Sequence, residues 1–492
     1  MENYFESMIP AEELSQLKYI PTIPEFVTWI EQKWGDLPAL SDTVNKLTYK
    51  QMCQEVACRR SLLASKGLVK GDKVAILDGI TPDVVMSFLA VTSAGMVAII
   101  LPSQLPAPAV AGCCLKFGVK LLLAGAGHIA TLPELPCPVV SIKDKASTPA
   151  PVTPVDKEDP CAIFFTGGTT GAPKGAVLPH RAIMRGSLNG CYAPGKQLGY
   201  HRYLCVLPLS HVFGLIRGTM SALYTGSEWI AGSDTKDSIT KFPVVRPTIL
   251  IAVPGICEIL LGLVKMYGKP FLGGELKYII AGAANVPPKL IGEFVEMGIN
   301  LFAGYGMTEG GNLTSGNINV VERPTSVGQI YPGQQTKVVD GELWIKGDNL
   351  FLGYYGDSEK TAETLTPDGW LKTGDLVRFD EEGFMYIVGR IKNLIILSNG
   401  ENVSPESIEE PFYKCPRLRD CLVREADGVI SVEILPRMEE FKDCSPEQIE
   451  SYFKDVLKGV NAALPSTHRV SKMTIRTEDF KRTGTMKVSR SQ

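Results

Sequence analysis

The chain has 492 residues, which is too many for one hydrophobic core, so we expect two or more domains. Hydrophobic residues make up 45% and charged residues 21%, as in an ordinary soluble enzyme. A net charge of −3 excludes the strongly basic field of a nucleic-acid-binding protein, and we therefore predict no nucleic-acid partner.

The N-terminal region and the apolar runs give no sign of a membrane segment. Residues 1–6 (MENYFE) are acidic and lack the regions of a signal peptide. The longest apolar run, residues 88–102, is shorter than a membrane span and is interrupted by Gly95. Twelve cysteines occur without any C-x-x-C spacing, which favours buried reduced thiols over a zinc site. We expect a cytoplasmic protein without a transmembrane segment.

Helix-like and strand-like segments alternate from about residue 22 to residue 142, a pattern typical of a parallel, doubly wound sheet. Strands are expected at residues 74–77, 97–101 and 120–124, and a helix after Pro82. A connector rich in proline and charge, residues 143–160, leads into a second alternating unit that ends near Tyr305.

The pattern changes twice in the last third of the chain. After Gly328, short β segments are expected at residues 336–339, 342–345, 376–379 and 384–388, which favours a small distorted β-barrel. Beyond Arg390, Ser404 and Pro405 form a helix start, and about a hundred residues remain, enough for a small α+β domain. The predicted fold is α/β, with a large domain at 1–391 holding two doubly wound sheets and the barrel, and a mobile domain at 392–492.

Residues 166–175 (TGGTTGAPKG) follow a buried apolar run, 161–165, and contain four glycines, three threonines and one lysine. Glycines let backbone N–H groups approach phosphate oxygens, threonines add hydroxyl donors, and Lys174 adds a cation. The loop is not an NTPase P-loop, because Pro173 precedes the lysine and Gly175 follows it. A flexible surface hairpin is the alternative structure. The composition favours a polyphosphate ligand.

Six further segments follow in order, and together with the loop they carry a resemblance: 208–215 (PLSHVFGL), 279–284 (IIAGAA), 304–309 (GYGMTE), 341–347 (GELWIKG), 369–375 (GWLKTGD) and 389–392 (GRIK). All seven resemble motifs of the adenylate-forming superfamily, which includes acyl-CoA synthetases, luciferases and the adenylation domains of peptide synthetases. Such enzymes join a carboxylate to ATP and must neutralise charge at the α-phosphate.

The resemblance implies a set of nucleotide-binding residues. The phosphates of ATP are assigned to Thr166, Gly167, Gly168, Thr169, Thr170, Gly171 and Lys174. Adenosine is assigned to Gly282, Ala283, Ala284, Tyr305, Gly306, Asp375 and Arg390, with Tyr305 beside adenine and Asp375 accepting from the ribose. Thr308 would donate to the α-phosphate. Mg²⁺ is assigned to Glu309 and Thr170, because it prefers hard oxygen ligands.

The resemblance also implies a moving C-terminal domain. Residues 481–490 (KRTGTMKVSR) resemble the loop that delivers a catalytic lysine, here Lys487. Met486 stands where glycine is usual, which would cost about 1 kcal/mol if that backbone needs a positive φ. Lys392 matches the hinge of the family, and Asn399 with Gly400 matches a loop beside the pantetheine channel, although Asn399 replaces a glycine.

The segment 208–215 resembles the wall of the acyl pocket. His211 stands where amino-acid-activating relatives carry an aspartate, and its neighbours are apolar, although a packed core histidine is the alternative. Gly310 and Gly311 are expected to leave space in the pocket. We therefore predict an acyl-CoA synthetase acting on a fatty, aryl or alicyclic acid, with ATP, Mg²⁺ and coenzyme A. An acyl-AMP ligase that loads a carrier protein, a luciferase-type oxygenase and an inactive nucleotide-binding module remain alternatives.

Overall fold

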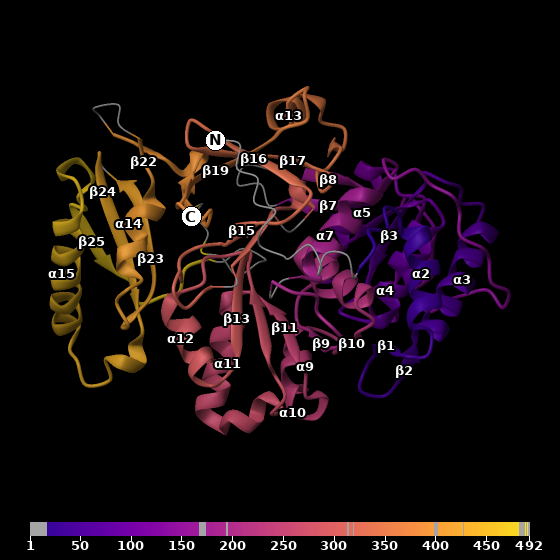
Figure 1. The fold of residues 1–492 in the computed structure, drawn as a ribbon, viewed down its shortest axis with the longest axis horizontal. Coiled ribbons are helices and arrows are strands. Elements are labelled where there is room, and N and C mark those ends of the chain that lie inside the picture. Colours follow the sequence, from indigo (N-terminus) through magenta and orange to yellow (C-terminus); the bar gives the residue numbers. More distant parts are fainter. Residues whose placement is uncertain are drawn as a thin grey trace.

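The computed structural model of the chain describes residues 17–166, 174–192, 195–311, 314–317, 319–397, 402–426, 428–481, 488 and 490. Figure 1 shows the N-terminal elements at one end of the longest axis and the yellow C-terminal segment at the other, with a second sheet between them. Within the described residues, no helix is long and apolar enough to cross a membrane.

The first sheet has seven strands, and its centre is parallel as predicted. Their order across the sheet is β18 (Gly353–Tyr354), β8 (Lys174–Pro179), β7 (Pro160–Thr166), β4 (Val97–Ile100), β3 (Lys73–Leu77), β5 (Leu121–Ala124) and β6 (Val139–Ser141). Only the pairs β7–β8 and β8–β18 are antiparallel. The three strands expected before residue 125 are confirmed.

Helices cover both faces of this sheet. They are α2 (Ile23–Trp34), α3 (Tyr49–Ser65), α4 (Pro82–Ser93), α5 (Ala107–Phe117), α6 (Ala126–Ile129) and α7 (His180–Gly190). Alternate residues of β3 enter different cores: Val74 belongs to the core that includes α4, and Ala75 to the core that includes α5. The helix α4 begins as predicted after Pro82, where the Thr81 hydroxyl accepts from the Val84 amide at 3.4 Å.

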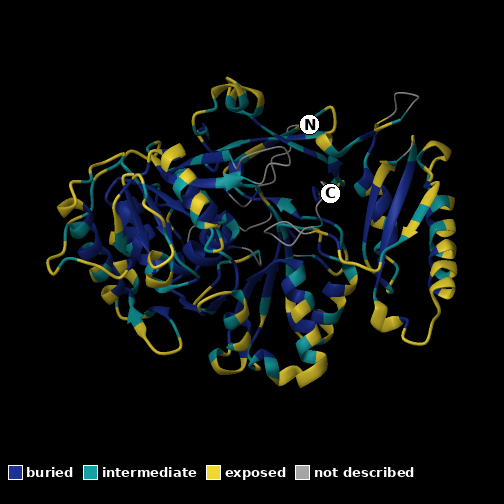
Figure 2. Cartoon of the chain, turned by 180° about the vertical axis from the view of Figure 1, so that it is seen from behind, coloured by how far each residue is buried: buried dark blue, intermediate teal, exposed yellow. Residues whose placement is uncertain are grey.

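The second sheet has nine strands and contains the predicted second alternating unit. The order is β15 (Gln329–Ile330), β14 (Ser315–Asn317), β13 (Asn300–Tyr305), β12 (Tyr278–Ala281), β11 (Ile249–Ala252), β9 (Arg202–Cys205), β10 (Glu228–Ala231), β1 (Pro38–Ser41) and β2 (Lys46–Thr48). Its helices are the π-helix η2 (Phe213–Met220), α8 (Ser221–Tyr224), α9 (Thr235–Thr240), α10 (Phe242–Val245), α11 (Pro254–Tyr267) and α12 (Pro288–Glu296). One continuous core joins the two sheets, and Figure 2 shows their strands buried beneath helices with exposed outer faces.

The β segments expected after Gly328 form one antiparallel sheet. Its order is β16 (Gln334–Val339), β17 (Glu342–Gly347), β19 (Leu371–Phe379) and β20 (Met385–Arg390), with α13 (Ser358–Thr364) in the connection before β19. A bridge between Gly328 and Met385 links β20 to the end of the nine-stranded sheet. This sheet therefore holds Asp375 and Arg390 beside the end of β13.

The C-terminal segment is a small α+β unit with its own core. Its elements are β21 (Ile395–Ile396), β22 (Asn402–Val403), α14 (Pro405–Phe412), β23 (Leu418–Ala426), β24 (Val429–Pro436), α15 (Pro446–Ala463) and β25 (Lys472–Ile475). Ser404 precedes α14 as predicted, but its hydroxyl does not cap the helix. It donates instead to the Val388 carbonyl of β20 at 2.7 Å, because Gly389 leaves no Cβ in its way. The predicted α/β fold class is confirmed.

Candidate active site

A polar cluster gathers at the carboxyl end of β13, where the strand ends at Tyr305. The Tyr305 hydroxyl donates to Asp375 Oδ2 at 2.6 Å. Arg390 contacts both oxygens of the same carboxylate, with Nε 2.5 Å from Oδ1 and an NH₂ nitrogen 3.1 Å from Oδ2. Asp375 and Arg390 are cross-strand partners on β19 and β20, so the sheet register fixes this pair. Three residues predicted from three separate motifs thus meet in one site.

Burial and charge shape the chemistry of this cluster. Asp375 is only 1% exposed. Burial, and then the adjacent Asp375 carboxylate, hold the pKa of Tyr305 well above its usual value, so the phenol stays protonated and donates. A carboxylate has about four acceptor positions, so the bonds from Tyr305 and Arg390 leave capacity for further donors. Asp375 can therefore accept from a ligand hydroxyl while its position is held.

A second polar contact lies around Glu309 in the short 3₁₀ turn η4 (Thr308–Gly310). Glu309 is buried, and its Oε1 accepts from the Tyr354 hydroxyl at 2.7 Å. Burial, and then the charge of Glu309, raise the pKa of that tyrosine. No described residue donates to Oε2, which leaves one hard oxygen of the kind that Mg²⁺ prefers. Glu309 therefore fits the metal-binding role.

Tyr354 also connects Glu309 with the phosphate-loop hairpin. It lies on β18, which pairs with β8, and Lys174 Nζ lies 5.6 Å from the centre of its ring. Thr166 and Lys174 are cross-strand partners at the loop end of the β7–β8 hairpin. The predicted phosphate residues lie outside the described residues: Gly167, Gly168, Thr169, Thr170 and Gly171. The described residues on either side of them, Thr166 and Lys174, pair with each other, and Lys174 lies beside Tyr354.

The predicted adenine segment follows β12 and has a strained backbone. Ala283 has φ of +64°, which a residue with a Cβ adopts at a cost of about 1 kcal/mol. A Cβ at Gly282 would lie 3.2 Å from the Phe213 ring and 3.3 Å from the Gly304 carbonyl oxygen, so glycine allows a close approach there. Such strain is often found at ligand sites. Ala284, half-buried, continues the turn.

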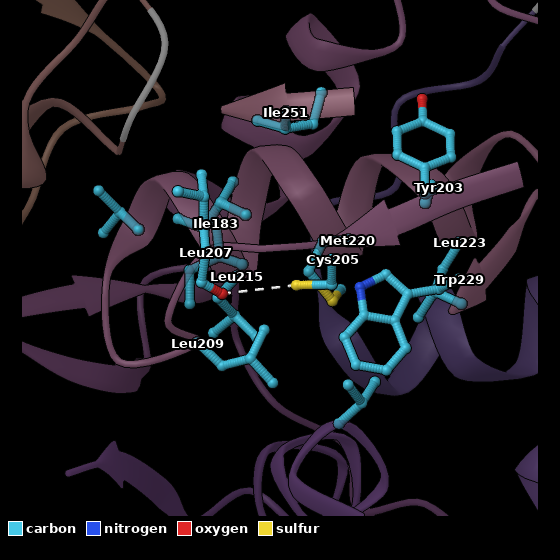
Figure 3. Close-up of a cluster of buried hydrophobic side chains, with 14 of the residues drawn as sticks. Ile183, Tyr203, Cys205, Leu207, Leu209, Leu215, Met220, Leu223, Trp229 and Ile251 are labelled. Carbon is cyan, nitrogen blue, oxygen red and sulfur yellow. Dashed lines mark hydrogen bonds between the residues drawn. The ribbon is translucent and has the colours of Figure 1, made fainter. Parts of the chain in front are cut away.

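The acyl-side prediction falls at the start of the π-helix η2. His211 is half-buried two residues before the helix, and burial lowers the pKa of its imidazole, which favours the neutral form. The Phe213 ring reaches Gly282, so this segment lies next to the adenine segment. Leu209, Val212 and Leu215 are buried around it, and Figure 3 shows part of this apolar cluster.

Some of the remaining predicted residues are described by the structure, and others are not. Thr308 begins η4 half-buried, and its hydroxyl donates to no described residue, while Gly306 is exposed between it and Tyr305. Lys392 lies in the turn η5 (Ile391–Asn393). Burial, followed by Arg390, lowers its pKa, and the carboxylates of Asp375 and Glu309 act in the opposite direction. Asn399, Gly400, Met486 and Lys487 lie outside the described residues.

One expectation about the pocket is wrong. Gly310 and Gly311 do not leave open space, because protein atoms fill it. A Cβ at Gly311 would lie 2.3 Å from the Asn349 carbonyl oxygen and 2.9 Å from that of Ala182, and φ there is +59°. A Cβ at Gly310 would lie 3.3 Å from Ile345 Cδ1. Both glycines serve close packing of the turn after Glu309.

One residue of the site, and one buried cation in η2, were missed from the sequence. Tyr354 has no motif of its own, and only the pairing of β18 with β8 brings it to Glu309. Arg217 did leave a signal, since it is the one Asp, Glu, Lys or Arg residue between Tyr203 and Ser227. A single charge inside a long apolar segment indicates a specific buried partner or ligand.

Comparisons with known proteins identify the family of the chain. A family model described as AMP-binding enzyme matches residues 27–355, and a model of the AMP-binding enzyme C-terminal domain matches residues 392–492. A 4-coumarate–CoA ligase-like protein of Arabidopsis thaliana is 32% identical over 61% of this chain, but the match covers only 57% of that relative. A feruloyl-CoA synthase of an Amycolatopsis species is 28% identical, over 77% of this chain and 80% of its own length.

A solved structure shows the same fold. It is the anthranilate CoA ligase AuaEII in complex with anthranoyl-AMP, with a TM-score of 0.83 at 20% identity. The superposition covers 96% of this chain and 97% of that one. At this identity the likeness establishes the architecture, including the small C-terminal unit.

Proposed function

Because this chain belongs to the AMP-binding enzyme family, we propose that it is an acyl-CoA synthetase. It joins an organic carboxylic acid to ATP with release of pyrophosphate, and then transfers the acyl group from acyl-AMP to coenzyme A. The observation that carries the proposal is the cluster of Tyr305, Asp375 and Arg390, three residues of separate motifs joined by hydrogen bonds at one strand end. The relatives named as CoA ligases support the choice of acceptor.

The nucleoside is held by groups that are already oriented. Asp375 accepts from the ribose hydroxyls, and its bonds to Tyr305 and Arg390 keep it in place before ATP arrives. Tyr305 presents its ring beside adenine because its hydroxyl is fixed to Asp375. The backbone of Gly282 to Ala284 forms the other wall. Binding then needs little rearrangement of these side chains, which favours affinity.

The phosphates lie toward Lys174 and Glu309. Lys174, with the loop residues 167–171, supplies donors and positive charge, and the Thr308 hydroxyl is available to the α-phosphate. Glu309 Oε2 and Thr170 would hold Mg²⁺, which when bound supplies further charge neutralisation to the polyphosphate. Tyr354 keeps Glu309 turned toward this side by holding Oε1.

The acid binds beside Phe213 and the neutral His211, with its carboxylate facing the α-phosphate. Two anions then approach each other, and Lys487 compensates their charge in the transition state. A carboxylate oxygen attacks the α-phosphorus and forms a bond to it. The bond between the α-phosphorus and pyrophosphate breaks, and pyrophosphate leaves. The thiolate of coenzyme A attacks the acyl carbon in the second half-reaction, and AMP leaves.

One site can serve both half-reactions if residues 392–492 turn about Lys392. Two features support this movement: the segment has a separate hydrophobic core, and it is linked to the rest of the chain through the short turn η5. A pivot of a few residues is sufficient for a domain rotation. The same turn would bring the loop of Asn399 and Gly400 toward the thiol.

The experiment is pyrophosphate release over a panel of fatty, aryl and alicyclic acids, with and without coenzyme A. Acid-dependent release followed by thioester formation with free coenzyme A supports the proposal. Release with thioester formation only on a carrier protein would favour the acyl-AMP ligase, and no release with any acid would favour an inactive module. Asp375→Asn should raise the KM for ATP, whereas Asp380→Asn, which weakens an ion pair with Arg323 just beyond the end of β19, should not.

A further inference from the structure

Arg217 is a fully buried cation without a partner. It lies in the π-helix η2, and its side chain is 0% exposed. None of its three guanidinium nitrogens has a hydrogen-bond partner, and it takes part in no ion pair among the described residues. A guanidinium keeps its proton in proteins, so it cannot escape the cost of burial by becoming neutral. Such a group normally has an acceptor, and none of the described residues supplies one.

The surroundings of Arg217 are built to admit this side chain. A Cβ at Gly190, at the end of α7, would lie 2.9 Å from Arg217 Cδ, so glycine there makes room for the chain. The guanidinium charge acts to lower the pKa values of Cys191, Tyr203 and Tyr331, against the larger effect of burial. The guanidinium therefore lies among α7, β9 and the residue that follows β15.

The described residues bring no carboxylate to Arg217. Among the described residues no acidic side chain lies within ion-pair distance of Arg217. The short stretches that interrupt the description next to these elements, residues 193–194, 312–313 and 318, contain no Asp or Glu. One more buried donor in the surrounding elements, Asn189 Nδ2 on α7, also has no partner. The Tyr203 hydroxyl on β9 lies beside the guanidinium, but it makes no well-formed hydrogen bond. Buried donors of η2 and α7 thus lack acceptors among the described residues.

The location of Arg217 links it to the acid. It follows Phe213 by four residues in the π-helix, close to one turn, and Phe213 touches Gly282 beside the predicted nucleotide. Buried apolar side chains of the same helix, Leu215 and Met220, belong to the cluster in Figure 3. Arg217 is therefore the one charged residue of a buried helix that begins beside Gly282.

Resting on the proposed acyl-CoA synthetase function, we propose that Arg217 binds a second carboxylate at the far end of the acid substrate. The substrate class is a dicarboxylic acid, aliphatic or aromatic, of which one carboxylate is adenylated and the other pairs with the guanidinium. A planar guanidinium matches a carboxylate in a bidentate geometry. A site built around such a donor rejects an apolar isostere, because the donor is then left unpaired.

The test compares acids of equal shape that differ in the second charge. Adipate is compared with 6-methylheptanoate, and terephthalate with 4-isopropylbenzoate, by the kcat/KM of pyrophosphate release. Wild type should prefer at least one diacid over its isostere by about tenfold or more. Arg217→Met should reduce kcat/KM for that diacid by about a hundredfold and raise it for the isostere. Arg217→Lys should keep part of the preference.

Arg60→Met is the matched control. Arg60 is also buried, but its guanidinium donates to the Ala150 carbonyl and the Ser93 hydroxyl. Its loss should lower stability and leave the ratio between diacid and isostere unchanged.

The outcomes separate the inference from the proposed function. Release with the isosteres but with neither diacid overturns the role of Arg217 alone, as does an Arg217→Met variant that is active with an unchanged ratio. No release with any acid, including the wider panel, overturns the synthetase function and this inference with it. If Arg217→Met does not fold, the wild-type enzyme alone tests the proposal: a diacid must be preferred over its isostere, and the absence of any such preference overturns it.

Discussion

The nucleotide site and the C-terminal segment are held in different ways. Asp375 is buried on β19, where it is the cross-strand partner of Arg390 on β20. It also accepts a hydrogen bond from Tyr305, which lies on another sheet. The segment after Lys392 contacts the large unit through isolated polar bonds, such as Ser404 to Val388 and the ion pair of Arg437 with Glu258 at 3.4 Å. The side proposed to bind ATP is therefore held rigidly, whereas the C-terminal segment is attached by contacts that can be exchanged.

The polar bonds of the C-terminal segment form a network on α14. Asn393 of the turn η5 donates to Glu406 at 2.6 Å, and Arg490 near the chain end lies 3.2 Å from the same carboxylate. Arg490 also pairs with the buried Glu409 at 2.6 Å. One helix thus connects the proposed pivot with the tail that follows Lys487. The network allows the segment to turn as one unit.

The largest expected effect comes from removing the tail lysine. Lys487→Ala leaves the negative charges of the carboxylate and the α-phosphate uncompensated, so acyl-AMP formation should fall by about a hundredfold to a thousandfold. Thioester formation from pre-formed acyl-AMP should persist, because the rigid nucleotide site is intact. Single-turnover pyrophosphate release and thioester formation measure the two steps.

Lys481→Ala is the control, since this exposed lysine begins the same tail. It should leave both half-reactions near wild type. Equal loss of both half-reactions in Lys487→Ala would contradict a role confined to adenylation. Loss of neither would contradict a catalytic role for Lys487.

Glu309→Gln tests the proposed Mg²⁺-binding role of Glu309 in the nucleotide site. It keeps the shape and the bond from Tyr354 but removes the charge that would face Mg²⁺. We expect adenylation to fall by about tenfold to a hundredfold and the Mg²⁺ concentration for half-maximal rate to rise. Tyr354→Phe, which frees Oε1 without changing the charge, should have a smaller effect. An unchanged metal titration in Glu309→Gln would show that Glu309 only supports the turn after Tyr305.

Much of this site could be predicted because its residues lie in segments with distinctive local sequence. Asp375 and Arg390 stand in such segments, and their pairing follows from the strands in which those segments were placed. Tyr354 could not be found in this way, since its contact with Glu309 depends on a strand pairing between distant parts of the chain. Local pattern predicts elements, whereas contacts across sheets depend on the whole fold.

The incorrect pocket prediction has a related cause. Glycine in a sequence indicates either room for a ligand or close approach of protein, and only the structure decides between them. At Gly311 the nearest atom is the Asn349 carbonyl oxygen, 38 positions further along the chain. Arg217 was equally ambiguous from the sequence, because its meaning depends on whether a partner lies nearby.

Lys392→Pro tests the proposed pivot of the C-terminal segment. Proline fixes φ near −65° and removes one N–H, so the segment should be trapped in one orientation. If ATP selects the adenylating orientation, pyrophosphate release in a single turnover should persist, while coenzyme A-dependent thioester formation falls by about tenfold or more. Lys392→Ala, which leaves the backbone free, is the control. Parallel decline of both rates with an intact fold by circular dichroism would place the pivot elsewhere.

The smallest expected effect concerns the pH dependence of stability through Glu409. Burial raises the pKa of this carboxyl to about 7, although Arg490 and the Val423 amide act to lower it. Its pKa in the unfolded chain is 4.5, so folding takes up a proton between these two values. The contribution of Glu409 to stability is therefore full below about pH 4.5 and is lost as the pH rises through 7.

Glu409→Gln should remove this contribution to the pH dependence, which we expect to be of the order of 1–3 kcal/mol between pH 5 and pH 8. Chemical unfolding at several pH values, with a fluorescence probe in the C-terminal segment, measures it. Glu410→Gln, an exposed neighbour on the same helix, is the control and should follow wild type. If stability instead rises with pH in wild type and this rise is absent in Glu409→Gln, the ion pair with Arg490 outweighs burial. The tail would then be fastened by charge rather than by a protonated carboxyl.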